Sequence, residues 1–221
     1  MVYNWLRRDN DAKNVIVFFN GWGLGQTAVR HLTFKADTDV LFVSDYTSLA
    51  NELPDLDAYQ HRYLVAWSLG VANYAAWQRS HTDIFDTKIA VNGTMQGIDR
   101  KLGIAEKVVQ HTIDTLCVDS LKEFISRCYN HQLSEQTQKI IKAITELDVS
   151  IKKKELEQIK DRQYSSNTNL VWDTIWISQQ DKIFPSKNQQ IAWQGHDPKL
   201  IDTAHMAFQN WRNWQDLLVS K

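Results

Sequence analysis

One serine in the chain has neighbours of the kind that a nucleophile needs. Ser68 follows the apolar run RYLVAW and precedes a run rich in alanine. A serine hydroxyl attacks a carbonyl carbon only if a base takes its proton and N–H groups stabilise the oxyanion. A sharp turn between a strand and a helix exposes such a serine, usually in the pattern G-x-S-x-G. Here Ala66 replaces the first glycine and Gly70 keeps the second. We predict a nucleophile at Ser68, and an ordinary turn serine is the alternative.

A glycine-rich loop earlier in the chain is suited to stabilise the oxyanion. The stretch FFNGWGLG, residues 18–25, follows the first apolar run. Gly21 and Gly23 can adopt unusual backbone angles, so the amide of Trp22 between them can turn towards the serine. A simple glycine-rich turn or a phosphate loop is the alternative. Neither G-x-G-x-x-G nor G-x-x-x-x-G-K-[ST] occurs, which argues against phosphate binding.

A base and an acid should follow the serine in the order Ser, Asp, His, each after a later strand. Asp181 comes shortly after the apolar run TIWIS, whereas Asp173 precedes that run and would lie at its opposite end. His205 follows the last candidate strand, and His196 precedes it. The sequence therefore predicts His205 as the base and Asp181 as its acid. A surface or structural role is the alternative for a single histidine.

The apolar runs that must position these residues indicate a parallel sheet. They are near-continuous rather than alternating, as is typical of strands buried on both faces. Six such runs occur, at residues 14–19, 39–44, 62–67, 88–93, 174–178 and 199–203. Helical segments are predicted between or after them, at 25–35, 69–81, 186–194 and 206–219. We predict an α/β fold with a mostly parallel sheet of six strands, or a similar number, flanked by helices.

Residues 98–166 break this alternation of strands and helices. The segment contains no proline, and apolar residues such as Leu121, Phe124 and Ile125 recur at helical spacing. We predict a helical lid inserted into the core. The core then consists of a first part, residues 1–97, and a second part, residues 167–221.

Composition excludes several classes of function. The 25 basic and 26 acidic residues give a net charge of −1, which provides no electrostatic footprint for nucleic acid or an anionic membrane. No stretch resembles a signal peptide or a membrane span.

The two cysteines, Cys117 and Cys128, form no disulfide framework and are expected to be buried thiols. The histidines and cysteines lack metal-ligand spacing. We expect a cytoplasmic protein without metal or cofactor.

The motifs FFNGWGL, AWSLG, AVNGT, DKIFPSKNQ and AHMAF occur in this order. Together they resemble the α/β-hydrolase superfamily and, more closely, the BioG-type pimeloyl-[acyl-carrier protein] methyl ester esterases of biotin synthesis. The resemblance covers the core at both ends of the chain, and the lid offers little that matches. It implies a serine carboxylesterase that releases methanol and a free carboxylate from a pimeloyl methyl ester on acyl carrier protein.

The resemblance also implies roles for individual residues. Ser68 would attack the ester carbonyl, His205 would take the serine proton, and Asp181 would hold the imidazole. The amides of Trp22 and Leu69 would form the oxyanion hole.

The acyl chain would lie in an apolar channel under the lid, with Trp22 and Trp67 as wall residues. The acidic carrier protein would dock on basic lid residues, and the candidates are Lys122, Arg127, Lys139 and Lys142. The alternative for each of them is an ordinary charged side chain on the solvent-exposed face of a helix. Three rival functions remain open: a thioesterase, an esterase for small esters, and a non-catalytic module that binds acyl chains or carrier protein.

Overall fold

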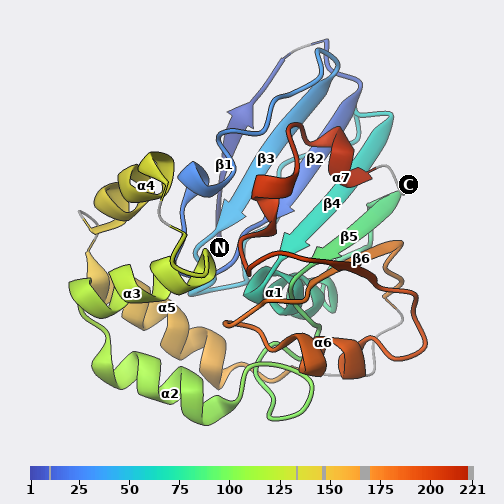
Figure 1. Ribbon diagram of the computed structural model, residues 1–221. Coiled ribbons are helices and arrows are strands. Elements are labelled where there is room, and N and C mark those ends of the chain that lie inside the picture. The colour runs from blue at the N-terminus through green and yellow to red at the C-terminus, as the bar shows by residue number, and fades with distance from the viewer. Residues whose placement is uncertain (10, 133, 146–147, 165–169, 219–221) are drawn as a thin grey trace.

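The computed structural model describes residues 1–221 except 10, 133, 146–147, 165–169 and 219–221. Seven described strands form one sheet in the order β1-β3-β2-β4-β5-β6-β7 (Figure 1). Their bounds are β1 Val2–Arg7, β2 Asn14–Phe19, β3 Thr38–Ser44, β4 His61–Trp67, β5 Thr87–Val91, β6 Thr174–Ser178 and β7 Lys199–Ile201. β1 pairs with β3 in antiparallel orientation, and every other pairing of these strands is parallel.

The mostly parallel α/β sheet is confirmed, and it has one strand more than the six apolar runs indicated. β1 has the sequence VYNWLR, in which the first half is exposed and the second half only partly buried. It lies at the edge of the sheet, where one side of the strand has no neighbouring strand. An edge strand does not need the continuous apolar run by which the other strands were found. The seventh strand therefore left no comparable signal in the sequence.

Helices cover the sheet and the end where its parallel strands finish (Figure 1). α1 (Leu69–Gln78) and α6 (Ser186–Ala192) follow β4 and β6. Four described helices lie between β5 and β6 in the chain, namely α2 Glu106–Thr115, α3 Val118–Cys128, α4 Glu135–Thr145 and α5 Val149–Asp161. They lie within the segment predicted as a helical lid, and the division of the chain into core and lid remains a prediction. Residues 165–166, at the end of the predicted lid, lie outside the described residues.

Two predicted helices are largely absent. Backbone pairing between the two segments explains both absences. Segment 25–35 contains only the 3-10 helix η1 (Gln26–Ala28), and segment 206–219 is divided into η2 (Ala207–Asn210) and α7 (Gln215–Leu218). The amide of Thr33 donates to the carbonyl of Arg212 at 2.9 Å, and the amide of Trp214 donates to the carbonyl of Thr33 at 3.2 Å. This pairing between distant segments takes backbone groups that α-helices would use.

The cysteine prediction is correct for one residue of the two. Cys128, the last residue of α3, is fully buried, whereas Cys117 is exposed. Cys117 is the N-cap of α3, where its sulfur accepts the amide N–H of Ser120 at 3.5 Å. A capping residue lies at the helix end rather than on the apolar face, which explains its exposure. In the described part of the chain, no helix combines the length and apolar character needed to cross a membrane.

The close packing of α1 on the sheet depends on Gly70. A Cβ atom added there would lie 2.2 Å from the carbonyl oxygen of Phe19 and 2.6 Å from that of Asn20. Backbone atoms of a buried strand cannot move aside cheaply. We expect Gly70→Ala to lower the free energy of unfolding by about 3 kcal/mol, measured by urea denaturation.

Gly25→Ala is the matched control for this stability measurement. Gly25 has an extended backbone with φ −98°, and a Cβ atom there would meet no atom within 4 Å. Its effect should stay within about 0.5 kcal/mol. Equal unfolding midpoints for the two variants would contradict the close-packing argument.

Candidate active site

Ser68 lies on a sharp turn between β4 and α1. Its backbone has φ 58° and ψ −128°, a conformation that residues other than glycine rarely adopt. Neighbours hold this conformation, because the amide of Ser68 donates to the carbonyl of Val91 at 2.9 Å and its carbonyl accepts the amide of Val71 at 3.1 Å. A Cβ atom on Gly93 would lie 2.2 Å from the Ser68 carbonyl oxygen. Strain of this kind is typical of functional turns.

The structure brings Ser68, His205 and Asp181 into one hydrogen-bonded row. His205 Nε2 lies 3.0 Å from Ser68 Oγ, and His205 Nδ1 lies 2.7 Å from Asp181 Oδ2. All three residues are buried, and they follow the carboxyl ends of β4, β7 and β6. Parallel strands end at one edge of the sheet, so residues far apart in sequence meet there. The arrangement is suited to move a proton from the serine hydroxyl to the imidazole.

The two rejected alternatives lie away from this row. Asp173 precedes β6, and its Oδ2 accepts the amide N–H of Lys88 at 2.8 Å at the opposite end of the strands. His196 is exposed, and its ring contacts the Trp193 ring at a centroid distance of 5.3 Å. The side-chain hydrogen bond of the Ser68 hydroxyl is made with His205 instead.

Both carboxylate oxygens of Asp181 are fixed by further donors. Oδ1 accepts the amide N–H groups of Ile183 and Phe184 at 2.9 and 2.8 Å. Oδ2 also accepts Nε2 of Gln189 at 3.2 Å. Gln189 is fully buried on α6, and sequence reasoning missed it. Its position on a short polar helix gave no sign of this contact.

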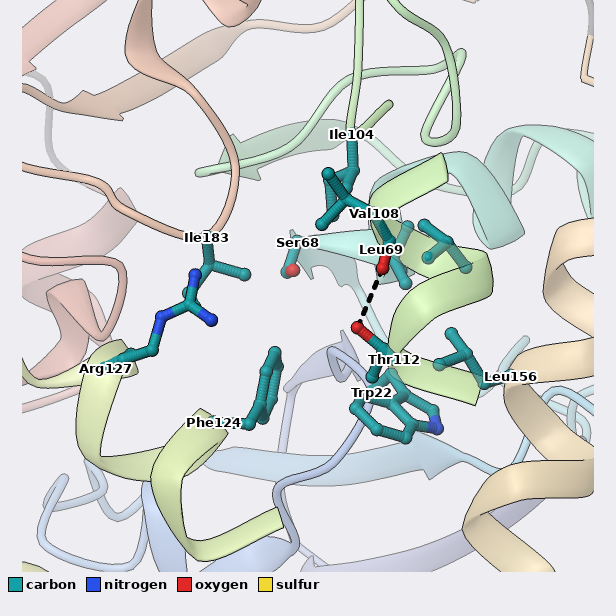
Figure 2. A pocket seen from close by; sticks show the side chains of 11 residues that line it. Trp22, Ser68, Leu69, Ile104, Val108, Thr112, Phe124, Arg127, Leu156 and Ile183 are labelled. Carbon is teal, nitrogen blue, oxygen red and sulfur yellow. Dashed lines mark hydrogen bonds between the residues drawn. The ribbon is translucent and has the colours of Figure 1, made fainter. Parts of the chain in front are cut away.

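A mostly apolar cavity that is partly open to solvent has Ser68 in its lining (Figure 2). Core and inserted helices both line it, through Trp22, Ser68, Leu69, Ile104, Val108, Val109, Thr112, Phe124, Arg127, Leu156 and Ile183. The hydroxyl of Thr112 is occupied, since it donates to the carbonyl of Val108 at 2.9 Å. Ser68 and Arg127 are left as the main polar side chains facing this space.

The glycine-rich loop passes close to the serine, as the predicted oxyanion role requires. A Cβ atom on Gly21 would lie 3.0 Å from the Ser68 Cβ atom and 2.8 Å from the Trp67 ring. Gly23 has φ 86°, which favours glycine. The Trp22 side chain lines the cavity, and its Nε1 donates to the carbonyl of Lys152 on α5 at 2.9 Å. Trp22 thus connects the loop to the inserted helices.

Trp67 does not line the cavity, so the prediction of a wall residue was wrong. Its side chain is fully buried, and its indole Nε1 donates to the carbonyl of His205 at 3.2 Å. Its ring packs edge-on against Phe208 at a centroid distance of 5.7 Å. Because β4 is buried on both faces, its last side chain enters the core instead of the space beyond the strand ends.

The four basic candidates occupy two inserted helices. On α3, Lys122 forms an ion pair with Asp119 at 3.0 Å, and Arg127 donates to the carbonyl of Lys182 at 3.3 Å. Lys139 and Lys142 are exposed on α4. Arg127 alone among these four lines the cavity.

Cys128 lies near the acid but is not a competing nucleophile. Burial, together with the negative charge of Asp181, raises the pKa of the Cys128 thiol well above its ordinary value. The thiolate, not the thiol, is the nucleophile, so a protonated Cys128 is inert.

Comparisons with known proteins identify the family of this chain. Residues 5–217 match the family described as pimeloyl-ACP methyl esterase BioG. A malonyl-[acyl-carrier protein] O-methyltransferase of Bacteroides fragilis is 34% identical over 87% of this chain, which spans only 39% of that relative's length. An uncharacterized protein of Haemophilus influenzae is 29% identical, and the match covers 95% of this chain and 96% of that protein.

Solved structures agree on the fold. The crystal structure of BioG from Haemophilus influenzae superposes with a TM-score of 0.83 and 26% identity, covering 98% of this chain and 99% of that one. A thermophilic esterase from Thermogutta terrifontis has a TM-score of 0.68 and 14% identity over 99% of this chain and 94% of that one, and shows the fold alone. The chain has the α/β-hydrolase fold and belongs to the BioG family of esterases.

Proposed function

We propose that this protein is a serine carboxylesterase that hydrolyses the methyl ester of a pimeloyl group carried by acyl carrier protein, within biotin synthesis. The observation that carries the proposal is the row of Ser68, His205 and Asp181, joined at 3.0 and 2.7 Å, with Ser68 lining an apolar cavity. Family membership supports the choice of ester and carrier. The products are methanol and a carboxylate that stays attached to the carrier.

The reaction proceeds in two halves. Ser68 Oγ attacks the ester carbonyl carbon while His205 Nε2 takes the hydroxyl proton. The tetrahedral intermediate collapses, the bond to the methoxy oxygen breaks, and His205 returns the proton to form methanol. Water then attacks the acyl-serine, again losing a proton to His205, and Ser68 leaves with that proton restored. Asp181 holds the imidazole in the required orientation throughout.

In our proposal, the backbone amides of Leu69 and Trp22 stabilise the oxyanion in both halves of the reaction. Leu69 is the first residue of α1, and the first N–H groups of a helix have no acceptor within it. The positive end of the helix dipole adds to this effect. The amide of Trp22, in the loop that packs against Ser68, supplies the second donor in our proposal. Removing one such donor typically costs on the order of 100- to 1000-fold in kcat.

The cavity is suited to an aliphatic acyl chain. Its walls are mostly aliphatic and aromatic, with Trp22 and Phe124 packed edge-to-face at a centroid distance of 5.1 Å (Figure 2). Burying each methylene group in such a site contributes about 0.8 kcal/mol. The acyl chain of the substrate would enter the cavity past Val108, which lines it and is 45% exposed.

The carrier protein would dock over α3 and α4, with Lys122, Arg127, Lys139 and Lys142 facing its acidic surface. Arg127 is the sharpest test, since it lines the cavity itself. We expect Arg127→Glu to raise KM for the carrier-bound ester about tenfold, because like charges meet across the interface. Initial rates over a range of carrier concentrations measure this.

Two controls separate docking from damage to the site. Lys13→Glu makes the same change of charge sign at an exposed position before β2, at the far end of the strands, and should leave KM unchanged. A small soluble ester tests the cavity itself, which Arg127 lines: a rise of KM confined to the carrier-bound ester indicates docking, and an equal rise for the small ester indicates damage to the cavity. An equal rise of KM in Lys13→Glu would contradict docking over α3.

Intact-mass spectrometry of the carrier-bound substrate tests the proposed function. The enzyme should convert the methyl ester to the acid and leave the thioester to the carrier intact. Thioester cleavage with the methyl ester untouched would instead indicate a thioesterase. If neither bond is cleaved and the substrate still binds, the chain is a binding module.

A further inference from the structure

The segment that carries His205 has little regular structure to hold it. It follows β7, a strand of three residues at the edge of the sheet, and precedes the short helix η2. A base must stay within hydrogen-bonding distance of its nucleophile to work. Contacts from other segments must therefore fix the position of His205.

The main-chain carbonyl of His205 is the point where these contacts meet. Its oxygen accepts Nδ2 of Asn92 at 2.7 Å and the indole Nε1 of Trp67 at 3.2 Å. The local amide of Ala207 donates to the same oxygen at 3.0 Å. The first two donors come from segments more than a hundred positions away in the chain.

Asn92 also ties this carbonyl to the strand that leads to the acid. Its Oδ1 accepts the amide of Ser178 at 2.7 Å, and its Nδ2 lies 2.7 Å from the Ser178 hydroxyl. Ser178 is the last residue of β6, and its carbonyl accepts the amide of Asp181 at 3.4 Å. Asn92 is fully buried with φ 47°, a left-handed conformation that asparagine tolerates better than most residues.

Trp67 makes the corresponding connection to the nucleophile. It immediately precedes Ser68, and its ring lies 5.1 Å from the His205 ring between centroids. One carbonyl oxygen is therefore tied both to the neighbour of the serine and, through Asn92, to the strand end before the acid. Both side chains donate an N–H group to this oxygen. The site is buried, and a buried N–H group without an acceptor lowers the free energy of unfolding.

We infer that Asn92 and Trp67 are positioning residues that fix the backbone of His205 and thereby align its imidazole between Ser68 and Asp181. The inference rests on the proposed catalytic function of these three residues. Neither positioning side chain lines the cavity, so neither should affect substrate binding. Their loss should lower kcat and leave KM nearly unchanged, since a displacement of about 1 Å at a reacting group can cost about 100-fold.

Trp67→Phe is the milder test, because it removes the indole N–H and keeps an aromatic ring. We expect kcat for a small soluble ester to fall about tenfold, with KM within about twofold of wild type. Trp214→Phe is the matched control. Trp214 is also fully buried and packs on Phe18, but its indole nitrogen has no hydrogen-bond partner among the described residues. It should leave both constants nearly unchanged.

Asn92→Asp is the stronger test at nearly constant volume. The aspartate keeps an acceptor for the Ser178 amide but presents an oxygen, not an N–H, to the His205 carbonyl. We expect kcat to fall about 100-fold. If this variant does not fold, Trp67→Phe still decides the question.

Proton NMR of the hydrogen-bonded Nδ1 proton of His205 provides a readout besides activity. The Trp67 ring lies 5.1 Å from the His205 ring, so its replacement alters the ring-current shift by itself, and the quantity to compare is the rate at which this proton exchanges with solvent. Exchange should be faster than in wild type in folded Trp67→Phe and unchanged in Trp214→Phe. Equal kcat values and equal exchange rates in these two variants would overturn the inference while leaving the esterase proposal intact. Conversely, a wild-type protein that hydrolyses no ester would defeat the proposed function, and the exchange rate would then report the contact alone.

Discussion

Replacing Ser68 by alanine is expected to lower kcat for the carrier-bound methyl ester by on the order of 10⁵-fold. The substitution deletes the oxygen that forms the acyl-enzyme, and no other described hydroxyl lies within hydrogen-bonding distance of His205 Nε2. KM should change little, because the cavity walls remain. Residual hydrolysis would reflect the amides of the oxyanion hole and substrate binding alone. Discontinuous assays run over hours, with the products resolved by mass spectrometry, can measure rates this far below that of wild type.

Ser80→Ala is the control for this variant. Ser80 is exposed just beyond α1, far from the cavity lining, and should retain wild-type activity. Circular dichroism should show that Ser68→Ala is folded, since alanine fits the same turn as serine. Substantial activity in folded Ser68→Ala would contradict the nucleophile assignment.

Replacing His205 by alanine is expected to lower kcat by at least about 10⁴-fold. Without the imidazole, the Ser68 hydroxyl has no base at 3.0 Å to take its proton, and Asp181 loses its partner at 2.7 Å. His196→Ala should retain full activity, because that exposed ring contacts Trp193 instead of the site. The same initial-rate assay measures both variants.

The losses of kcat in Ser68→Ala and His205→Ala should not multiply when the two substitutions are combined. Ser68 and His205 act as a unit, so the double variant should be about as slow as either single variant. Independent, multiplying losses would contradict proton transfer between them. Near wild-type activity in His205→Ala would contradict the assignment of the base.

The parallel part of the fold could be predicted because it depends on local patterns. Strands buried on both faces, such as β2 and β4, need continuous apolar runs, and these runs are visible in the sequence. β1 lacks the pattern because it is an edge strand. The helices predicted at 25–35 and 206–219 fail because Thr33 pairs with the C-terminal segment, a long-range contact without a local signal.

The candidate site also contains residues that local sequence patterns predict and residues that they do not. Ser68, Asp181 and His205 could be predicted as a set because each follows a strand, and strand ends meet at one edge of a parallel sheet. The residues that hold them could not be predicted. Gln189 contacts Asp181, and Asn92 contacts the His205 carbonyl, through side chains brought together only by the fold. Trp67 was assigned to the wrong role because composition does not tell a channel wall from a buried hydrogen-bond donor.

Labelling with a fluorophosphonate, followed by peptide mapping, tests the central claim most directly. The reagent forms a stable bond with an activated serine and with few others, so it reports the nucleophile without depending on the substrate. We predict one adduct per chain, on Ser68, with loss of ester hydrolysis in proportion to labelling. His205→Ala should label far more slowly than His196→Ala. An unlabelled wild-type protein that still hydrolyses the methyl ester, or an adduct on another residue, would contradict the account.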